Sequence, residues 1–256
     1  MDSDSRPLLA ATIAPLGLPP RDALAFLSKI GIRGAAISAT DRSTRPRELD
    51  RSARRDLVAC MGRLELHCAA VDCFLPVAHF LDPAEVDRAT SAAIGAIELA
   101  AEIASLEGRK GLGTVVLPLP ASEEALFQAT ADAIAQASQH HGVRVAQPSA
   151  DPTSVRAPFL VAIDPAQVLA SGNDPLSITL AAVGKIGAVR IVDLLRSGNR
   201  GPIGEPQEAQ LDLHAFVSAC RAAGFTEDFV VDMRQWTDPR GGLLATLERW
   251  SAGVRL

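Results

Sequence analysis

Four polar side chains stand within or at the end of apolar runs in the second half of the chain, where they could do chemistry. Gln147 ends the run VRVAQ, Asp164 ends FLVAID, Arg190 lies inside AVRIVDLL, and Asp232 lies near the end of DFVVDM. An arginine inside an apolar run needs a partner, because an unpaired buried charge is very costly. The sequence therefore raises the question of what faces Arg190: a substrate, a metal site or a structural carboxylate.

Apolar runs and helical patterns alternate along all 256 residues and predict the scaffold that positions these side chains. We predict strands over residues 8–15, 34–40, 67–74, 114–120, 143–147, 159–164, 189–195 and 228–234. Helical patterns follow over residues 20–30, 52–61, 84–106, 122–140, 165–183, 213–223 and 239–250. Strict alternation implies a parallel sheet with helical crossovers. Eight strands, each expected to be followed by a helix, favour an α/β fold, a (β/α)8 TIM barrel that forms a single domain over residues 1–256, rather than an open sheet.

Side-chain alternation along these strands suggests which residues face the barrel interior. In a (β/α)8 barrel the chemistry lies at the carboxyl ends of the strands, here called the mouth. Because successive side chains of a strand point to opposite faces, we expect Gln147, Asp164, Arg190 and Asp232 to point inward and converge at the mouth.

Further polar residues lie within or after the strands predicted over residues 67–74 and 189–195. His79, in PVAHFLD, lies on the correct rim and could reach a substrate or cap a loop, and Asp72 could face inward or form a salt bridge. Asp193 follows Arg190 by three positions. The glycine-rich loop of residues 196–205 holds Arg196 and Arg200, which could bind a phosphate or carboxylate group; a solvated loop is the alternative.

The order of three motifs resembles the xylose-isomerase-like TIM barrels, the sugar phosphate isomerases and epimerases. The motifs are Asp164-Pro after a strand, VRIVDLL with its glycine-rich loop and a Leu-Asp-Leu helix start, and GFTEDFVVDM. The resemblance implies a divalent metal (Mn, Mg, Zn or Co) held by Glu, Asp, His and Glu at the last four strand ends. It also implies that the two glutamates move a proton beside the sugar carbonyl. The first Glu falls on Gln147, the Asp on Asp164, the His on Arg190 and the last Glu on Asp232.

This chain departs from that ligand set at three of the four positions. Gln147 is neutral and cannot act as a base at pH 7, and Arg190 cannot lose its proton to ligate a metal. Asp232 is a conservative replacement. We therefore expect the Arg190 guanidinium to occupy the place of the metal and to pair with Asp164, Asp232 or both. A cofactor is not assigned on these residues.

The sequence leaves three functions open. The first is a sugar isomerase/epimerase-like protein that binds a small polar, carbohydrate-type ligand at a degenerate metal site. The second is a catalytically silent relative that acts as a ligand-binding or assembly subunit. The third is an endonuclease-IV-like nuclease, which needs a ring of zinc ligands; five histidines, most of them away from strand ends, and a net charge of −5 count against it.

Composition narrows the partners and the setting. The acidic balance argues against nucleic acid, and we see no apolar run long enough to span a membrane. Four cysteines without a CxxC pair suggest a reducing, cytoplasmic compartment. The sequence leaves open a homo-oligomer.

Overall fold

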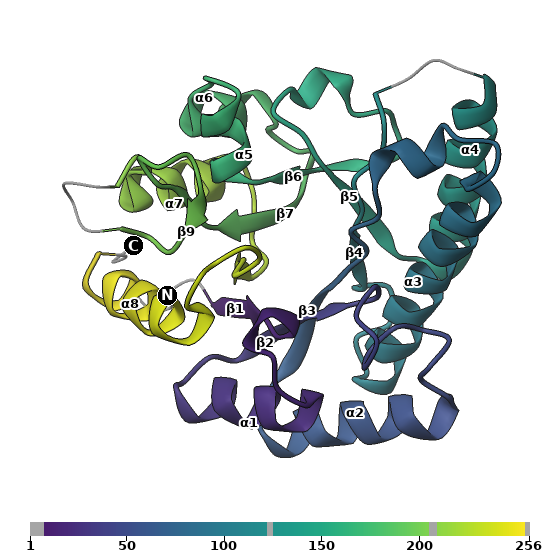
Figure 1. Ribbon diagram of the computed structural model, residues 1–256, viewed down its shortest axis with the longest axis horizontal. Helices are drawn as coiled ribbons and strands as arrows, with labels where there is room; N and C mark the ends of the chain where they lie inside the picture. The colour runs from purple at the N-terminus through teal and green to yellow at the C-terminus, as the bar shows by residue number, and fades with distance from the viewer. Residues whose placement is uncertain (1–7, 122–124, 205–208, 254–256) are drawn as a thin grey trace.

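Eight parallel strands close into a barrel in the computed structural model, which describes residues 8–121, 125–204 and 209–253. Their order around the barrel is β1-β10-β7-β6-β5-β4-β3-β2, and the predicted fold class is confirmed (Figure 1). A short hairpin, β8 and β9, follows β7. The strands are β1 (Leu9–Thr12), β2 (Gly34–Ser38), β3 (His67–Asp72), β4 (Thr114–Val116), β5 (Arg144–Pro148), β6 (Leu160–Ile163), β7 (Ile186–Ile191), β8 (Asp193–Leu194), β9 (Arg200–Gly201) and β10 (Phe229–Val231).

Helices surround the strands as an outer layer (Figure 1). They are α1 (Pro20–Lys29), α2 (Arg51–Arg63), α3 (Val86–Leu106), α4 (Ala125–His141), α5 (Pro165–Ala170), α6 (Pro175–Ala181), α7 (Leu213–Ala222) and α8 (Pro239–Gly253). Three short 3-10 turns complete the elements: η1 (Ala14–Leu16), η2 (Val77–Phe80) and η3 (Pro152–Ser154). The predicted β–α alternation is wrong at one step, because only η3 lies between β5 and β6.

The helix predicted over residues 165–183 is two helices, α5 and α6. Gly172 has a φ of +76°, a left-handed conformation that ends a helix and that glycine adopts without strain. The Asp174 side chain then accepts hydrogen bonds from the backbone N–H groups of Leu176 and Ser177 and caps α6, with Pro175 in its first turn. The SGNDP sequence therefore bends the chain while keeping both helix ends satisfied.

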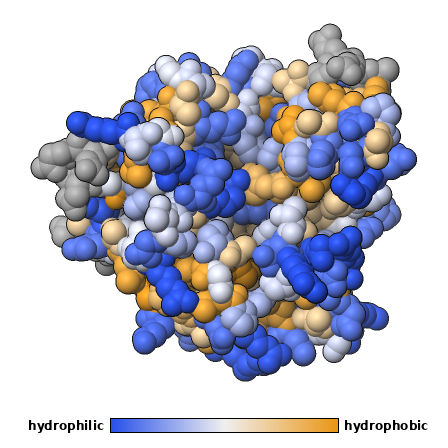
Figure 2. Space-filling model, in the orientation of Figure 1, coloured by the Kyte–Doolittle hydropathy of each residue, from blue (hydrophilic) through white to orange (hydrophobic). Residues whose placement is uncertain are grey.

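Helix α3 belongs to the outer helix layer, and its inner face is buried in the protein core. It is long and apolar enough to cross a membrane by length and composition, which corrects the expectation that no apolar run approaches that length. It packs against α4 and β3, and its inward residues, among them Ala93, Ile97 and Leu99, are buried. The face of the molecule in Figure 2 is largely hydrophilic, with apolar side chains scattered between the polar ones.

The barrel interior is lined by small side chains. One buried residue from each strand contributes to an interior cluster of six alanines and two valines: Ala10, Ala36, Ala70, Val116, Ala146, Ala162, Ala188 and Val230. At the adjacent position Gly34, an added Cβ would lie 2.7 Å from the Cβ of Ala10, so only glycine fits there. The interior thus has room for a few long side chains above this layer, at the mouth.

Candidate functional site at the barrel mouth

Arg190 spans the barrel interior and is almost completely buried, with 1% of its surface exposed. It lies on β7, and four steps around the barrel bring the strand order to β3 on the opposite side. There the Arg190 Nη2 donates a hydrogen bond to Asp72, itself buried at the end of β3. The inward orientation of Arg190 agrees with the prediction. Its expected pairing with Asp164 or Asp232 is wrong, because its ion-pair partner is Asp72.

Arg200 lies where the sequence analysis placed the guanidinium of Arg190. Its Nη1 is 2.8 Å from Asp164 Oδ2, and its Nη2 is 2.9 Å from Asp232 Oδ2. Asp164 and Asp232 follow β6 and β10, the two neighbours of β7 in the barrel. Arg200 of the 196–205 loop thus contacts carboxylates of the protein's own side chains, and binding of a ligand anion by this loop stays a prediction; residue 205 lies outside the described residues.

Asp193 stabilises the β8–β9 hairpin, which positions Arg200 at the mouth. Its carboxylate is fully buried and accepts hydrogen bonds from the backbone N–H groups of Leu194, Gln210 and Leu211. Burial raises the pKa of Asp193, although these hydrogen bonds oppose the rise. The structure therefore gives Asp193 a positioning contact within the loop rather than a place among the charges of the mouth.

Arg234 completes the group and was not singled out from the sequence. It donates hydrogen bonds to Asp232, and its Nη2 lies 3.7 Å from Asp164 Oδ2. Its guanidinium carbon is 3.3 Å from the centre of the Phe74 ring, a cation–π contact. Because Arg234 follows Asp232 by two positions, side-chain alternation in DMR could have placed both on the same side.

The six side chains of this mouth network carry three positive and three negative charges. They are Arg190, Arg200, Arg234, Asp72, Asp164 and Asp232. The network is largely dry, since Asp72, Asp164 and Asp232 are each at most 4% exposed. Such buried charges are tolerated only when paired and hydrogen-bonded.

The network shifts the pKa values of its members in different directions. Burial alone would raise the pKa of Asp232, but the Arg234 hydrogen bond and the charges of Arg234, Arg190 and Arg200 outweigh it and lower the pKa to about 2. Burial raises the pKa of Asp72 despite the opposing charge of Arg190. Burial would lower the pKa of Arg234, but the hydrogen bond to Asp232 and the nearby carboxylates raise it.

Three donors of the network lack an acceptor among the described residues. They are the buried Nε and Nη1 of Arg190 and the buried Nε of Arg200. A buried donor without a partner is costly, and hydroxyl, carbonyl or carboxylate oxygens are the groups that would satisfy it.

Gln147 lies outside the mouth, which corrects the prediction that it points inward. Ala146 occupies the interior cluster, whereas Val145 packs in the layer between strands and helices. Gln147 therefore faces α4, where its Nε2 donates to the carbonyl of Leu119 at 3.0 Å and it lines a cavity of about 680 Å³. In VRVAQ each face of the strand carries one polar residue, Arg144 beside Ala146 and Gln147 beside Val145, so alternation gives no clear signal; the narrow interior takes the smaller alanine.

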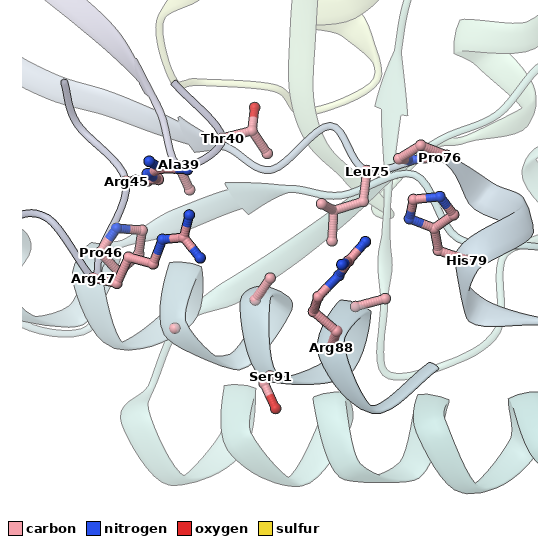
Figure 3. A pocket seen from close by; sticks show the side chains of 13 residues that line it. Ala39, Thr40, Arg45, Pro46, Arg47, Leu75, Pro76, His79, Arg88 and Ser91 are labelled. Carbon is pink, nitrogen blue, oxygen red and sulfur yellow. The ribbon is translucent and has the colours of Figure 1, made fainter. Parts of the chain in front are cut away.

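His79 and Arg196 lie apart from the network. His79, half-buried in η2, lines a separate cavity of about 470 Å³ beside the mouth (Figure 3). Arg196 is exposed in the β8–β9 turn and takes part in no ion pair among the described residues. Five of the predicted site residues thus belong to the mouth network: Asp72, Asp164, Arg190, Arg200 and Asp232.

Metal ligands are scarce in the part of the chain that the structure describes. It contains no group of three or more histidine, cysteine, aspartate or glutamate side chains arranged to hold a metal ion. The two carboxylates carried over from the resemblance, Asp164 and Asp232, both contact arginines.

Comparisons with known proteins identify the fold. No protein-family model matches the chain, and no curated protein matches it by sequence. Among solved structures, a D-tagatose 3-epimerase-like protein is similar with a TM-score of 0.74 and 13% identity, over 96% of this chain and 97% of the other. An L-ribulose 3-epimerase gives a TM-score of 0.67 and 16% identity, over 97% and 96% of the two chains.

A third similar structure is a xylose isomerase-like TIM barrel protein from Mycobacterium smegmatis in complex with magnesium. Its TM-score is 0.69 at 9% identity, over 98% of this chain and 97% of that protein. At such identities the likeness concerns the fold and leaves the chemistry to the residues at the mouth. The chain has the fold of the xylose isomerase-like TIM barrel proteins. Its structural neighbours with this fold include sugar epimerases.

Proposed function

We propose that this barrel binds a small polar, carbohydrate-type ligand at its mouth without a divalent metal, and that it does not catalyse metal-dependent isomerisation. The observation that carries the proposal is Arg200, whose guanidinium bridges Asp164 and Asp232 at 2.8 and 2.9 Å. The Arg200 guanidinium supplies the positive charge that a metal ion would otherwise provide to balance these carboxylates, and it repels a second cation.

The residues present do not fit a divalent metal. The carboxylates of the mouth network already pair with arginines, and the positions expected for a glutamate and a histidine hold Gln147 and Arg190. Gln147 also faces α4 rather than the mouth. The same argument counts against the nuclease alternative, whose zinc ring needs more ligands than these residues offer.

The acid–base properties of the mouth argue for binding rather than proton transfer. A general base works best when its pKa lies near the operating pH. Asp232, with a pKa lowered to about 2, is a very weak base. Asp72 has a raised pKa but is engaged by Arg190. Neither carboxylate is therefore prepared to remove a proton beside a sugar carbonyl.

An oxygen-rich ligand suits the groups that remain. The side chains of Arg200 and Arg234 keep 16% and 30% of their surface exposed, so they are the accessible part of the network. Arg190 and Arg200 have donors without an acceptor among the described residues, and Phe74 offers an aromatic ring next to Arg190 and Arg234. The sugar epimerases with the same fold favour a carbohydrate as the ligand class.

Ketose binding with and without metal tests this proposal. D-tagatose and L-ribulose should bind equally well in EDTA and in Mn²⁺, measured by calorimetry, and should exchange no carbon-bound proton with solvent. Arg200→Met should weaken binding at least about tenfold through the loss of a charged hydrogen-bond donor. Arg196→Ala, an exposed arginine of the same hairpin, is the matched control and should bind as the wild type does.

Two results would overturn the proposal. One is stoichiometric binding of Mn²⁺ together with proton exchange into the ketose, which would establish isomerase chemistry. The other is that Arg196→Ala and Arg200→Met lose ketose binding equally, or that neither loses it, while circular dichroism shows both variants to be folded.

A further inference from the structure

The cavity that His79 lines is separate from the mouth network and lies between the loops that follow β2 and β3 and one face of α3. Its volume is about 470 Å³, within the range of small-molecule sites. We propose that this cavity binds a small organic anion that combines an apolar ring or short chain with a single carboxylate or phosphate group. This site does not depend on the function proposed for the mouth.

The walls and floor of the cavity are mainly apolar. Ala39 follows β2, Leu75 and Pro76 follow β3, and Ala89 and Ala92 lie on α3. In Figure 3 the Ser91 hydroxyl points away from these residues. The small side chains of α3 leave the space open, and an apolar ligand group would gain by leaving water there.

The rim of the cavity is basic. Arg45, Arg47, Arg88 and His79 line it, and its lining includes no carboxylate. Figure 3 shows Arg45 and Arg47 on one side, with Arg88 and His79 on the other, so an anion between the two sides would meet cationic groups from both. Arginine is the residue best suited to grip a carboxylate or phosphate.

The acidic neighbours of these arginines do not cancel their charge. Glu48 lies 3.1 Å from Arg45 and 3.5 Å from Arg47, so two guanidinium groups share one carboxylate. Arg88 pairs with Glu85 but keeps 75% of its side-chain surface exposed. Exposed ion pairs of this kind are weak, and a ligand anion can compete for them. The Nε of Arg45 is also buried without an acceptor among the described residues.

The mouth network and the cavity have no residue in common. Phe74 contacts Arg234 in the mouth network, whereas the next residue, Leu75, lines the cavity. Variants of Arg200 and of Arg88 therefore separate binding at the mouth from binding in the cavity.

Phenyl phosphate, inorganic phosphate and benzyl alcohol probe this site by ligand-observed NMR and calorimetry. We expect phenyl phosphate to bind more tightly than either single-feature probe. Arg88→Ala should weaken its binding about tenfold, as the loss of one charge-assisted contact does. Ala92→Leu, which fills the floor without changing charge, should also weaken it, whereas Arg63→Ala, an exposed arginine at the far end of α2, should leave it unchanged.

Each contrary result overturns the proposal. Inorganic phosphate that binds as tightly as phenyl phosphate would show an adventitious ion only. Equal losses in Arg88→Ala and Arg63→Ala would show general surface attraction, and unchanged binding in folded Ala92→Leu would place the ligand elsewhere. Loss in Arg200→Met with no loss in Arg88→Ala would place it at the mouth.

Discussion

The two ends of the barrel hold their charges in different environments. At the carboxyl end, Arg190 pairs with Asp72 with 1% and 5% of the side-chain surfaces exposed. At the amino end, Arg144 pairs with Glu227 at 3.0 Å, and about a third of each side chain is exposed, 32% and 34%. The sequence thus builds ion pairs at both ends of one barrel, and the Arg190–Asp72 pair at the mouth is much more deeply buried than the Arg144–Glu227 pair at the amino end.

This difference decides what a broken pair should cost. An exposed pair loses little when one partner is removed, because water solvates the charge that remains. A buried pair leaves an uncompensated charge in a poor solvent, and that penalty is several times larger. The mouth should therefore be sensitive to single substitutions, and the amino end should tolerate them.

Removal of Arg190 is the largest expected perturbation. Arg190→Ala should lower the free energy of unfolding by about 3 kcal/mol or more, because Asp72 would keep a buried charge without its partner. Denaturant unfolding followed by circular dichroism measures this loss. An unchanged unfolding curve would show that Arg190 does not neutralise Asp72 in solution.

A double variant serves as the control for this substitution. Arg190→Met with Asp72→Asn removes both charges and keeps most of the volume, so it should be more stable than Arg190→Met alone. If the second substitution restores nothing, the loss reflects the packing of the arginine side chain above the alanine layer and not its charge.

Asp232 gives a second contrast through its pH dependence. Its pKa in the folded protein, about 2, lies below the usual value of 3.8, so the carboxylate contributes stability that is present above pH 4. This contribution, about 2 kcal/mol, should be lost as the pH falls from 4 through 2. The difference in unfolding free energy between the wild type and Asp232→Asn should therefore shrink over this window in a urea titration. A difference that is constant between pH 5 and pH 2 would contradict the lowered pKa.

The barrel and the inward position of Arg190 could be predicted from local sequence. Strands and helices alternate clearly, and AVRIVD places its single charged interior residue between Ala188 and Val192. The partner of Arg190 could not be read from the same stretch. Asp72 lies 118 positions earlier in the chain, and only closure of the barrel brings β3 opposite β7.

Two errors at the mouth have the same physical origin. The inward prediction for Gln147 is wrong because each face of VRVAQ holds one polar residue, Arg144 or Gln147, and alternation alone does not say which face is the interior. Arg200 cannot be distinguished from Arg196 in the sequence, because a glycine-rich loop has no periodicity that fixes side-chain direction. In both cases the tertiary environment decides: barrel width for the first residue and the carboxylates of Asp164 and Asp232 for the second.

Arg144 at the amino end should give the smallest effect and so provides the most direct test of the comparison. Arg144→Met removes the contact to Glu227 and the 2.9 Å hydrogen bond to Thr114 while keeping the aliphatic stem. We expect a loss of about 1 kcal/mol or less in the unfolding free energy, because both charged partners are partly solvated. High salt should reduce the loss further by screening the pair. A loss as large as that of Arg190→Ala would mean that burial does not distinguish the two ends, and the low tolerance of the mouth would then need another cause.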